Sequence, residues 1–349
     1  MSKVFYKSLG KFEKWPNLEG ISSASLTYDD VLLVPQNSNI KSRQDIDVKV
    51  MLGPYKLTIP IISAPMDTIT GEKMAIALAE NGAIAALPRG DLEERARLCN
   101  QFSRNDMPCV YAVSLKNGFN EAKTLKENGA KVIVVDAANG GLQKYIELCS
   151  LIKKELKLFV IGGNIATYNQ ALMYKKANID IAKVGIGPGG TCITRMIAGV
   201  GFPQLSAIFE TTSSGVPVIA DGGIKKPADF AKAIAAGANM IMVGSLFGGA
   251  DETPGKVING KKIVRGQASH SYMKDNGVKR NEFRSAEGIT VEVSPTGPVE
   301  NALAELMGGL RSAMSYSGAH NISEYQKKAV FCNISNATLS ENIPWLNTS

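Results

Sequence analysis

The stretch VPVIADGGIKKPADFAKAIAAGANMIMVGS, residues 216–245, contains two strand patterns separated by a helix pattern. Val218–Asp221 and Met240–Gly244 are short and almost entirely apolar, as expected of parallel strands that are covered on both faces. Between them, Pro227–Gly237 has the amphipathic pattern of a helix. The stretch is therefore typical of one strand–helix–strand unit in a parallel sheet.

The same alternation extends over most of the chain. Eight strand-like runs start 22 to 27 residues apart, except for a gap of 37 between the sixth and the seventh. This count and spacing predict a (β/α)8 TIM barrel and disfavour the alternative, a doubly wound open sheet. The runs are Pro60–Ser63, Ala83–Leu87, Val110–Ser114, Val132–Asp136, Phe159–Gly162, Ile181–Gly185, Val218–Asp221 and Met240–Gly244. The other helix patterns include Phe119–Asn128, Tyr145–Leu156 and Asn169–Ala177.

We expect one domain over residues 1–349, with no second domain inserted into the barrel. Residues 1–55 form an N-terminal lead-in, and residues 299–318 have the pattern of a closing helix. A long polar excursion, residues 245–298, follows the eighth strand. Excursions of this length are usually active-site flaps or disordered segments, and we expect this one to be disordered in the free protein.

The composition excludes several classes of protein. With 44% hydrophobic and 20% charged residues, the chain is typical of a globular protein. It has no apolar run long enough to span a membrane and no secretory signal. The five cysteines form no CxxC pair, which predicts a reduced, cytoplasmic protein with free thiols, of which Cys99, Cys149 and Cys332 are buried. The net charge of +7 is scattered, which favours anionic small molecules over nucleic acid as ligands.

The strongest chemical signal is GIGPGGTCITR, residues 185–195, after the sixth strand. Clustered glycines allow backbone groups to approach a ligand or an ion closely. Cys192 lies within this loop and is a candidate nucleophile, and Thr194 adds a hydroxyl group two residues later. The chain has only two histidines, so acid–base work would fall to Thr194, to a carboxylate such as Glu287, or to water.

The loops after the last two strands indicate a nucleotide site. In barrels these loops commonly bind phosphate through backbone N–H groups, a use that fits Gly223, Gly244 and Ser245. Asp221 and Asp136, each at the end of a strand, could accept hydrogen bonds from ribose hydroxyls. No GxGxxG follows a strand, so a dinucleotide would have to bind across the mouth of the barrel.

Several motifs resemble those of the IMP dehydrogenase / GMP reductase family. They are SAPMDT, DAANG, ADGGI, AAGANMIMVGSLF and GGLRSAMSYSGA, together with the Cys192 loop. The resemblance runs from Leu26 to about Ser335, nearly the whole chain. It implies a (β/α)8 barrel, a homotetramer and a purine nucleotide substrate, GMP or IMP.

Four features favour the reductase branch of the family. No CBS insertion follows the second strand, the chain contains no Arg-Tyr dipeptide, the segment from Gly266 to Glu287 is short, and DAANG resembles the loop of the reductases. The resemblance then implies that GMP is converted to IMP and ammonia with NADPH, through a thioimidate on Cys192. The alternative is a dehydrogenase without CBS domains that oxidises IMP to XMP with NAD.

The family motifs assign roles to particular residues. Catalysis would fall to Cys192, Thr194 and Glu287. The substrate would contact Ser63, Met66, Asp221, Gly222, Gly223, Gly244, Ser245, Gly266, Gln267, Ala268, Arg284, Ser285, Ala286 and Gly288. The cofactor would contact Asp136, Ala137, Ala138, Arg89 and Phe283 and, across a subunit boundary, Ser42, Arg43, Ser312, Ala313, Met314 and Ser315. A monovalent cation, K⁺, would be held by Gly187, Gly189 and Cys192 with Arg195.

Three departures from the family pattern affect these assignments, and the first is that Gln267-Ala268-Ser269 in the excursion is atypical of the family. Gly190 stands where the family usually has a serine that helps to hold phosphate, and Thr191 is a candidate substitute. Pro88-Arg89 replaces the His-Lys of the reductases, although an arginine can still pair with a phosphate of the cofactor.

Overall fold

A computed structural model describes residues 4–7, 11–14, 25–255, 257–277 and 285–342. Eight parallel strands form one sheet in the order β6-β13-β12-β11-β10-β9-β8-β7. The sheet closes between β6 and the residue before β7, where Ser63 N donates to Ile84 O and Ile84 N to Ile61 O, each at 3.1 Å. The strands are β6 (Ile61–Ser63), β7 (Ala85–Leu87), β8 (Cys109–Val113), β9 (Val132–Asp136), β10 (Phe159–Ile165), β11 (Ile181–Val184), β12 (Val218–Asp221) and β13 (Met240–Val243). The predicted barrel is confirmed.

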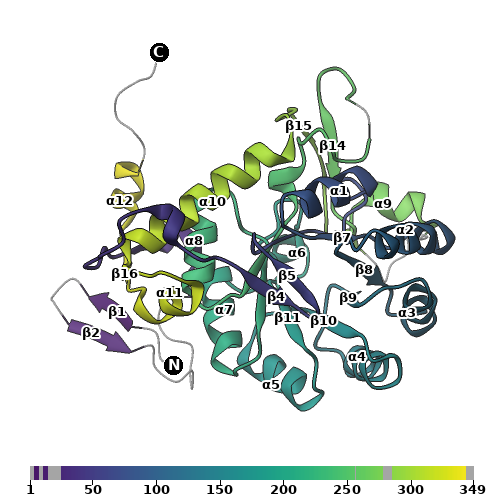
Figure 1. Cartoon of the computed structure of the whole chain (residues 1–349), viewed down its shortest axis with the longest axis horizontal. Coiled ribbons are helices and arrows are strands. Elements are labelled where there is room, and N and C mark those ends of the chain that lie inside the picture. The colour runs from purple at the N-terminus through teal and green to yellow at the C-terminus, as the bar shows by residue number, and fades with distance from the viewer. Residues whose placement is uncertain (1–3, 8–10, 15–24, 256, 278–284, 343–349) are drawn as a thin grey trace.

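Helices surround the barrel, as Figure 1 shows. They are α1 (Glu72–Glu80), α2 (Leu92–Arg104), α3 (Gly118–Glu127), α4 (Gln143–Leu156), α5 (Tyr168–Lys176), α7 (Gln204–Ser213), α8 (Pro227–Ala235) and the closing helix α10 (Val299–Tyr316). Each predicted helix lies within a few residues of the one observed, because the apolar spacing that defines it is also the face it buries.

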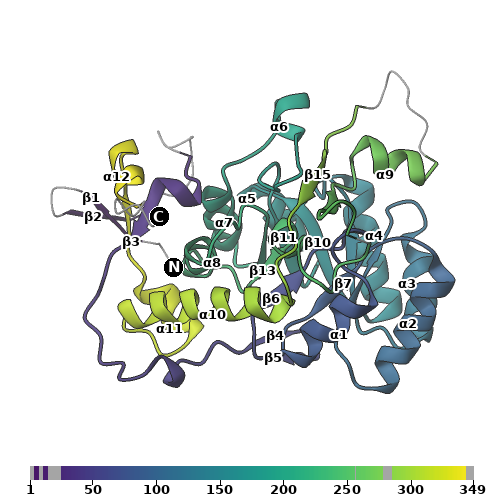
Figure 2. The same ribbon diagram turned by 90° about the horizontal axis from the view of Figure 1, so that it is seen from above.

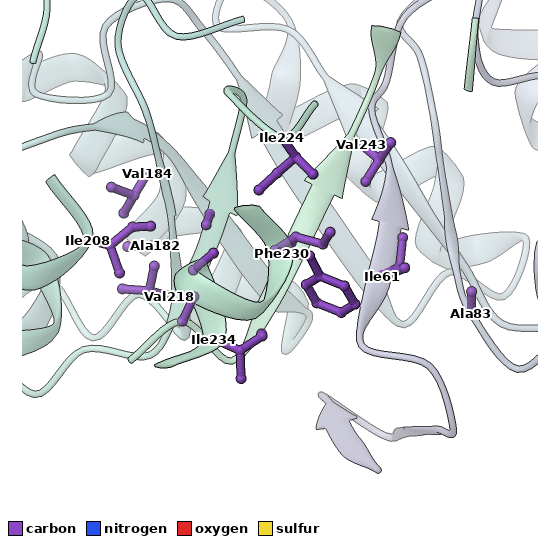
Figure 3. Packing of buried hydrophobic residues seen from close by; sticks show 14 of the residues in the cluster. Ile61, Ala83, Ala182, Val184, Ile208, Val218, Ile224, Phe230, Ile234 and Val243 are labelled. Atoms are coloured by element: carbon purple, nitrogen blue, oxygen red, sulfur yellow. The ribbon is translucent and has the colours of Figure 1, made fainter. Parts of the chain in front are cut away.

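Successive strand residues alternate between the inside and the outside of the barrel. On β12, Ile219 belongs to the apolar cluster inside the barrel, whereas Val218 and Ala220 belong to the cluster beneath the helices. Figure 3 shows Phe230 and Ile234 of α8 packed into this outer cluster. Full burial of one such side chain contributes about 1.5–3 kcal/mol, so this layer holds the helices on the barrel.

A hairpin closes one end of the barrel. Its strands are β4 (Val50–Leu52) and β5 (Tyr55–Leu57), and its Leu52 and Leu57 side chains are buried in the interior cluster. Figure 2 shows the hairpin at one end of the barrel and α6 (Thr194–Ile197) and α9 (His270–Asp275) at the other. The carboxyl ends of the barrel strands, at the end of α6 and α9, are therefore left for ligands.

The two ends of the chain meet in a second sheet, which the sequence did not predict. Its order is β2 (Lys11–Lys14), β1 (Val4–Lys7), β16 (Phe331–Asn333) and β3 (Val31–Leu33). Part of the 1–55 lead-in is thus paired with the chain after the barrel. The remaining short elements are η1 (Tyr28–Asp30), η2 (Arg43–Asp45), α11 (Ile322–Lys328) and α12 (Asn336–Glu341).

The excursion after β13 has regular structure in its described residues, which differs from the expected disorder. It contains η3 (Ser245–Phe247), helix α9, and strands β14 (Lys262–Arg265) and β15 (Thr290–Val293), which pair in antiparallel fashion. Arg265 anchors this hairpin to the loop after β6, because its Nε lies 3.0 Å from Asp67 Oδ2 and its backbone N donates to Thr68 Oγ1 at 3.1 Å. Arg265 and Asp67 are 198 positions apart in the sequence, so the sequence pattern could not reveal this ion pair.

All five cysteine thiols are free, as predicted. Cys99 and Cys149 are buried, but Cys332 is half-buried on β16, which corrects the prediction that it would be buried. Burial raises the pKa of the Cys149 thiol to about 12. In the described part of the chain, no helix is long and apolar enough to cross a membrane.

Candidate active site

Three glycine-bearing loops converge at the carboxyl end of the barrel. A Cβ atom on Gly222, after β12, would lie 3.0 Å from Gly189 N, and a Cβ atom on Gly190 would lie 2.8 Å from Ser245 Oγ. The loops after β11, β12 and β13 therefore lie against one another, and glycine is needed where they touch. Backbone N–H groups gathered in this way form a cradle suited to an anion.

Cys192 lies at the edge of this cradle. Its backbone N donates to Gly189 O at 3.0 Å, which turns the loop back toward the glycines. Its thiol is only half-buried and lies 3.2 Å from Thr194 Oγ1, to which it can donate. Thr194 begins α6, so its hydroxyl is held by a helical turn. The two groups that the sequence singled out are therefore in hydrogen-bonding contact.

The excursion brings Glu287 to the same loop. Ile193 N donates to Glu287 O at 2.8 Å, and Cys192 pairs with Gly288 in an isolated bridge. Ala268 O in turn accepts from Glu287 N at 3.1 Å. Residues almost a hundred positions apart are thus joined through their backbones, which brings Glu287 next to the Cys192–Thr194 segment.

A buried lysine on β11 connects two of the predicted ribose-binding residues. Lys183 is 4% exposed, and its Nζ lies 3.1 Å from Asp221 Oδ2 and 3.7 Å from Asp136 Oδ1. It also donates to Asn164 Oδ1, and Asn164 Nδ2 donates to Asp221 Oδ2 at 2.8 Å. Burial would lower the pKa of Lys183, but the carboxylates of Asp221 and Asp136 raise it above its usual value. Lys183 is therefore charged and fixes both carboxylates.

Sequence reasoning missed Lys183, although a signal was present. Ile181 faces the interior of the barrel, and Lys183, two residues later, shares its face. By the same alternation Asp136 and Asp221 follow interior residues Val134 and Ile219. A lysine on the inward face of an apolar strand needs a carboxylate partner, and the ends of β9 and β12 supply two.

Arg89, after β7, extends the array of charges. Its Nε lies 3.4 Å from Asp136 Oδ2, and its guanidinium donates to Gln267 Oε1 at 3.1 Å. Gln267 also donates to Pro65 O, in the loop after β6. Arg89, assigned to the cofactor, and Gln267, assigned to the substrate, are therefore in contact. Positive and negative side chains alternate from Arg89 through Asp136 and Lys183 to Asp221.

The other residues that were assigned to the substrate differ in how exposed they are to solvent. Ser63 is fully buried, and its hydroxyl accepts from Thr70 Oγ1 at 2.8 Å. Met66 lies over Gly244, whose Cβ position is 3.2 Å from Met66 Sδ. Thr191, the candidate substitute for the family serine, is buried, and a Cβ atom on Gly266 would lie 3.2 Å from its Oγ1. Other residues on the described part of the excursion are Ala268, Ser285 and the buried Ala286.

The cofactor assignments lie in two places. Asp136 and Ala137 are half-buried and Ala138 is exposed at the end of β9. The second group consists of Ser42 and Arg43, next to or within η2, and Ser312, Ala313 and Ser315 on α10. The assignment of Met314 to the cofactor is corrected, because this residue lies on the buried side of α10 with 0% exposure and its side chain is part of the core. Phe283 and Arg284 lie outside the described residues.

The cation assignment rests on backbone carbonyls. Among the described residues, no backbone N–H donates to the carbonyl of Gly187 or Cys192, so both oxygens are available to an ion. Gly187 has φ +90, and the Arg195 side chain lies against it and donates to Phe202 O at 2.7 Å. The Arg195 side chain therefore stabilises the loop. Because its guanidinium group is positively charged, only the backbone carbonyl of Arg195 could face a cation. The described residues contain no group of His, Cys, Asp or Glu side chains that could hold a metal ion.

The structure is a (β/α)8 barrel with a glycine cradle and a half-buried thiol at the carboxyl ends of its strands, which is where barrel enzymes have their active sites. Residues 25–345 match the IMP dehydrogenase / GMP reductase domain, and the chain belongs to this family.

The relatives and the solved structure described next are all GMP reductases. The chain is 34% identical to GMP reductase 1 of Rattus norvegicus over 88% of this chain and 95% of the relative. It is also 34% identical to GMP reductase of Escherichia coli O81 (strain ED1a), over 88% of this chain and 94% of the relative. A crystal structure of GMP reductase from Trypanosoma brucei in complex with guanosine 5'-monophosphate superposes with a TM-score of 0.87 at 28% identity, covering 94% of this chain and 99% of that one.

Proposed function

We propose that this chain is an oxidoreductase that converts GMP to IMP and ammonia with NADPH. The observation that carries the proposal is the half-buried Cys192 thiol, which lies 3.2 Å from Thr194 Oγ1 beside a glycine cradle at the mouth of the barrel. The similarity to GMP reductases over 88% of the chain supports GMP as the substrate.

The chain's residues have separate roles in this reaction. The glycine cradle and Ser245 hold the phosphate of GMP, and Asp221 accepts hydrogen bonds from the ribose. This places C2 of the purine beside Cys192, whose sulfur attacks C2 while the bond from C2 to the exocyclic nitrogen breaks. Thr194 and Glu287 relay the proton that the leaving nitrogen needs, so that ammonia departs and a thioimidate joins Cys192 to the purine.

The second half of the reaction restores the thiol. NADPH, when bound, supplies a hydride for C2 of the purine. The bond from C2 to Cys192 sulfur then breaks, and the sulfur leaves with its electron pair as IMP forms. Asp136, held by Lys183 and Arg89, is placed to orient the ribose of the cofactor. The positive charge of Arg89 suits a phosphorylated cofactor.

The carbonyls of Gly187 and Cys192 would hold K⁺, and the ion would fix the conformation of the Cys192 loop. Gly189 O, which already accepts from Cys192 N, would be a third ligand through its second lone pair. Carbonyl oxygens that lack N–H partners are suited to a weakly hydrated monovalent ion. K⁺ would have no part in the bond-breaking steps.

We also propose a single catalytic domain over residues 1–349 that assembles as a homotetramer. Leu87 ends β7 and Leu92 begins α2, which leaves no room for an inserted domain between them. Met196, Ile197 and Val200 on and after α6 are 82%, 49% and 56% exposed, and such apolar groups are typical of a contact with another subunit. Light scattering coupled to size-exclusion chromatography measures the assembly.

The test of the proposed function is a pair of reactions followed through the absorbance of reduced nicotinamide, with K⁺ present. One contains GMP and NADPH and the other IMP and NAD. We expect a GMP-dependent loss of NADPH with release of ammonia. Formation of XMP from IMP, with no reaction of GMP, would show that the chain is instead a dehydrogenase.

A further inference from the structure

A cavity that is open to solvent lies far from the Cys192 loop, at the end of the barrel closed by the β4–β5 hairpin. Its volume is about 1110 Å³, and its walls come from the hairpin turn, the C-terminal ends of α3 and α4, the start of β10, and the residues just before β9 and β11. Figure 2 shows that this hairpin and α6 are at opposite ends of the molecule. Ligand sites of about 300–1000 Å³ are usual for small molecules, so the cavity has ample room for one.

The cavity has an apolar floor. Ala130, Leu156 and Leu158 are 6%, 7% and 5% exposed, and all three line it together with Phe159. Gly53, with φ +58, allows the hairpin turn to pack over this floor, because a Cβ atom there would lie 2.9 Å from the Phe159 ring. The hairpin thereby forms a wall on one side of an apolar surface.

The lining has a strong excess of positive charge. Five lysines line the cavity, at positions 126, 131, 153, 154 and 157, against one carboxylate, Asp180. Asp180 is already satisfied, since Lys153 Nζ lies 2.6 Å from its Oδ1 and Val160 N donates to its Oδ2 at 2.8 Å. It cannot also neutralise the other four cations.

The remaining lysines differ in their partners. Lys154 reaches only its neighbour Glu155, at 3.7 Å, and Lys131 lies 5.8 Å from the centre of the Tyr55 ring. In the part of the chain that the structure describes, the side chains of Lys126 and Lys157 have no ion pair or hydrogen bond. Lysines in the last turn of a helix complement the helix dipole, which accounts for Lys126, but Lys131 lies outside any helix.

We propose that this cavity, lined by Lys126, Lys131 and Lys157 over the Leu156–Phe159 floor, binds a small molecule that joins a flat apolar group to two or more phosphates, the chemistry of a nucleoside polyphosphate. The flat group packs on the apolar floor, and the lysine ammonium groups surround the phosphates. A lysine is a compact charge with three donors, which suits a flexible phosphate chain. The site is separate from the one where GMP and NADPH are proposed to bind.

Isothermal titration calorimetry of the full chain tests this proposal. GMP and NADP⁺ are present at saturation so that the proposed active site is occupied, and ATP, GTP and inorganic triphosphate are titrated in turn. We expect saturable binding of one nucleoside triphosphate per chain. Inorganic triphosphate should bind more weakly, because it leaves the apolar floor uncovered, and the two nucleotides show which base the floor prefers.

The double variant Lys126→Glu/Lys157→Glu should weaken this binding at least about tenfold, which corresponds to about 1.4 kcal/mol. The matched control is Lys73→Glu/Lys327→Glu, which changes the net charge equally at two exposed lysines that do not line the cavity. The control should bind as the unaltered chain does. The neutral pair Lys126→Met/Lys157→Met, which avoids new repulsion, should weaken binding in the same direction.

Three results would overturn the proposal. They are the absence of saturable nucleotide binding, an equal loss in the cavity variant and the control, and tighter binding of inorganic triphosphate than of either nucleotide. A single-stranded oligonucleotide that binds the same lysines more tightly than ATP would assign the cavity to nucleic acid instead. Because the active site is filled throughout and activity is not the readout, failure here leaves the proposed reaction untouched.

Discussion

Lys183 Nζ lies 3.1 Å from Asp221 Oδ2 and 3.7 Å from Asp136 Oδ1, inside the carboxyl end of the barrel. The two carboxylates are the proposed ribose ligands of the substrate and of the cofactor. One buried ammonium group therefore sets the positions of both, and without it two carboxylates would face each other in a site with little water.

Replacing Lys183 by methionine should damage both binding and stability. Removal of one partner from a buried ionic cluster costs about 3–5 kcal/mol of unfolding free energy. Misplacement of the ribose ligands should lower kcat/KM for GMP about 100-fold. Urea unfolding and steady-state kinetics measure the two effects. Lys183→Arg, which keeps the charge, should recover part of both, and an unchanged kcat/KM in Lys183→Met would refute a positioning role.

Gly222 tests the proposed phosphate cradle. Its φ is +92 and a Cβ atom would lie 3.0 Å from Gly189 N, so Gly222→Ala should push the two loops apart and raise KM for GMP about tenfold. Gly260→Ala is the matched control, because Gly260 has φ +74 but open space around its Cβ position. Both variants place an alanine at positive φ, which costs about 1–2 kcal/mol in each, and only the first should alter KM. Equal KM values in the two variants would count against the cradle.

Arg89 tests the cofactor site. Its Nε lies 3.4 Å from Asp136 Oδ2 and its guanidinium donates to Gln267 Oε1 at 3.1 Å. We expect Arg89→Ala to raise KM for NADPH about tenfold while KM for GMP changes much less, since the lost charge faces the cofactor side. Arg97→Ala, on the exposed face of α2, should alter neither constant. A rise confined to KM for GMP would place Arg89 in the substrate site.

Asp29 predicts a pH dependence of stability. Hydrogen bonds from Lys225, and then Lys226, hold the pKa of its carboxyl below the usual value, even though partial burial acts in the opposite direction. A depressed pKa means that the ion pairs stabilise the fold above the pKa of the unfolded chain and lose this effect as the pH falls through the folded value. Asp29→Asn should therefore be less stable than the unaltered chain at neutral pH. Thermal unfolding should show the difference shrinking in acid, and a difference independent of pH would contradict the assignment.

Much of the fold could be predicted because its signals are local. The β12 run Val218–Asp221 is mostly apolar, is followed by Gly222-Gly223 and lies one helix before the next strand, and the alternation of apolar run and helix recurs around the barrel. The sheet containing β1 and β16 could not be predicted, since its strands are three or four residues long and its partners lie at opposite ends of the chain. The excursion was expected to be disordered because it is long and polar, and its stabilising Arg265–Asp67 contact is too distant in sequence to be anticipated.

The site was predictable to a different extent. Cys192 and Thr194 are two residues apart in a distinctive loop, so their contact could be anticipated. Met314 was assigned to the cofactor from a motif, and helix periodicity places it in the core instead. Lys183 lies in no loop motif, and only the alternation of inward residues on β11 could have revealed it.

The measurement that tests the account most directly compares the unaltered chain with Cys192→Ala in the presence of GMP, NADPH and K⁺. NADPH oxidation and ammonia release are followed together. The account predicts that the unaltered chain consumes one NADPH for each ammonia released. Cys192→Ala should still bind GMP but lose turnover by at least about a thousandfold, because the thioimidate can no longer form. Reductive release of ammonia by Cys192→Ala at a comparable rate would contradict the account.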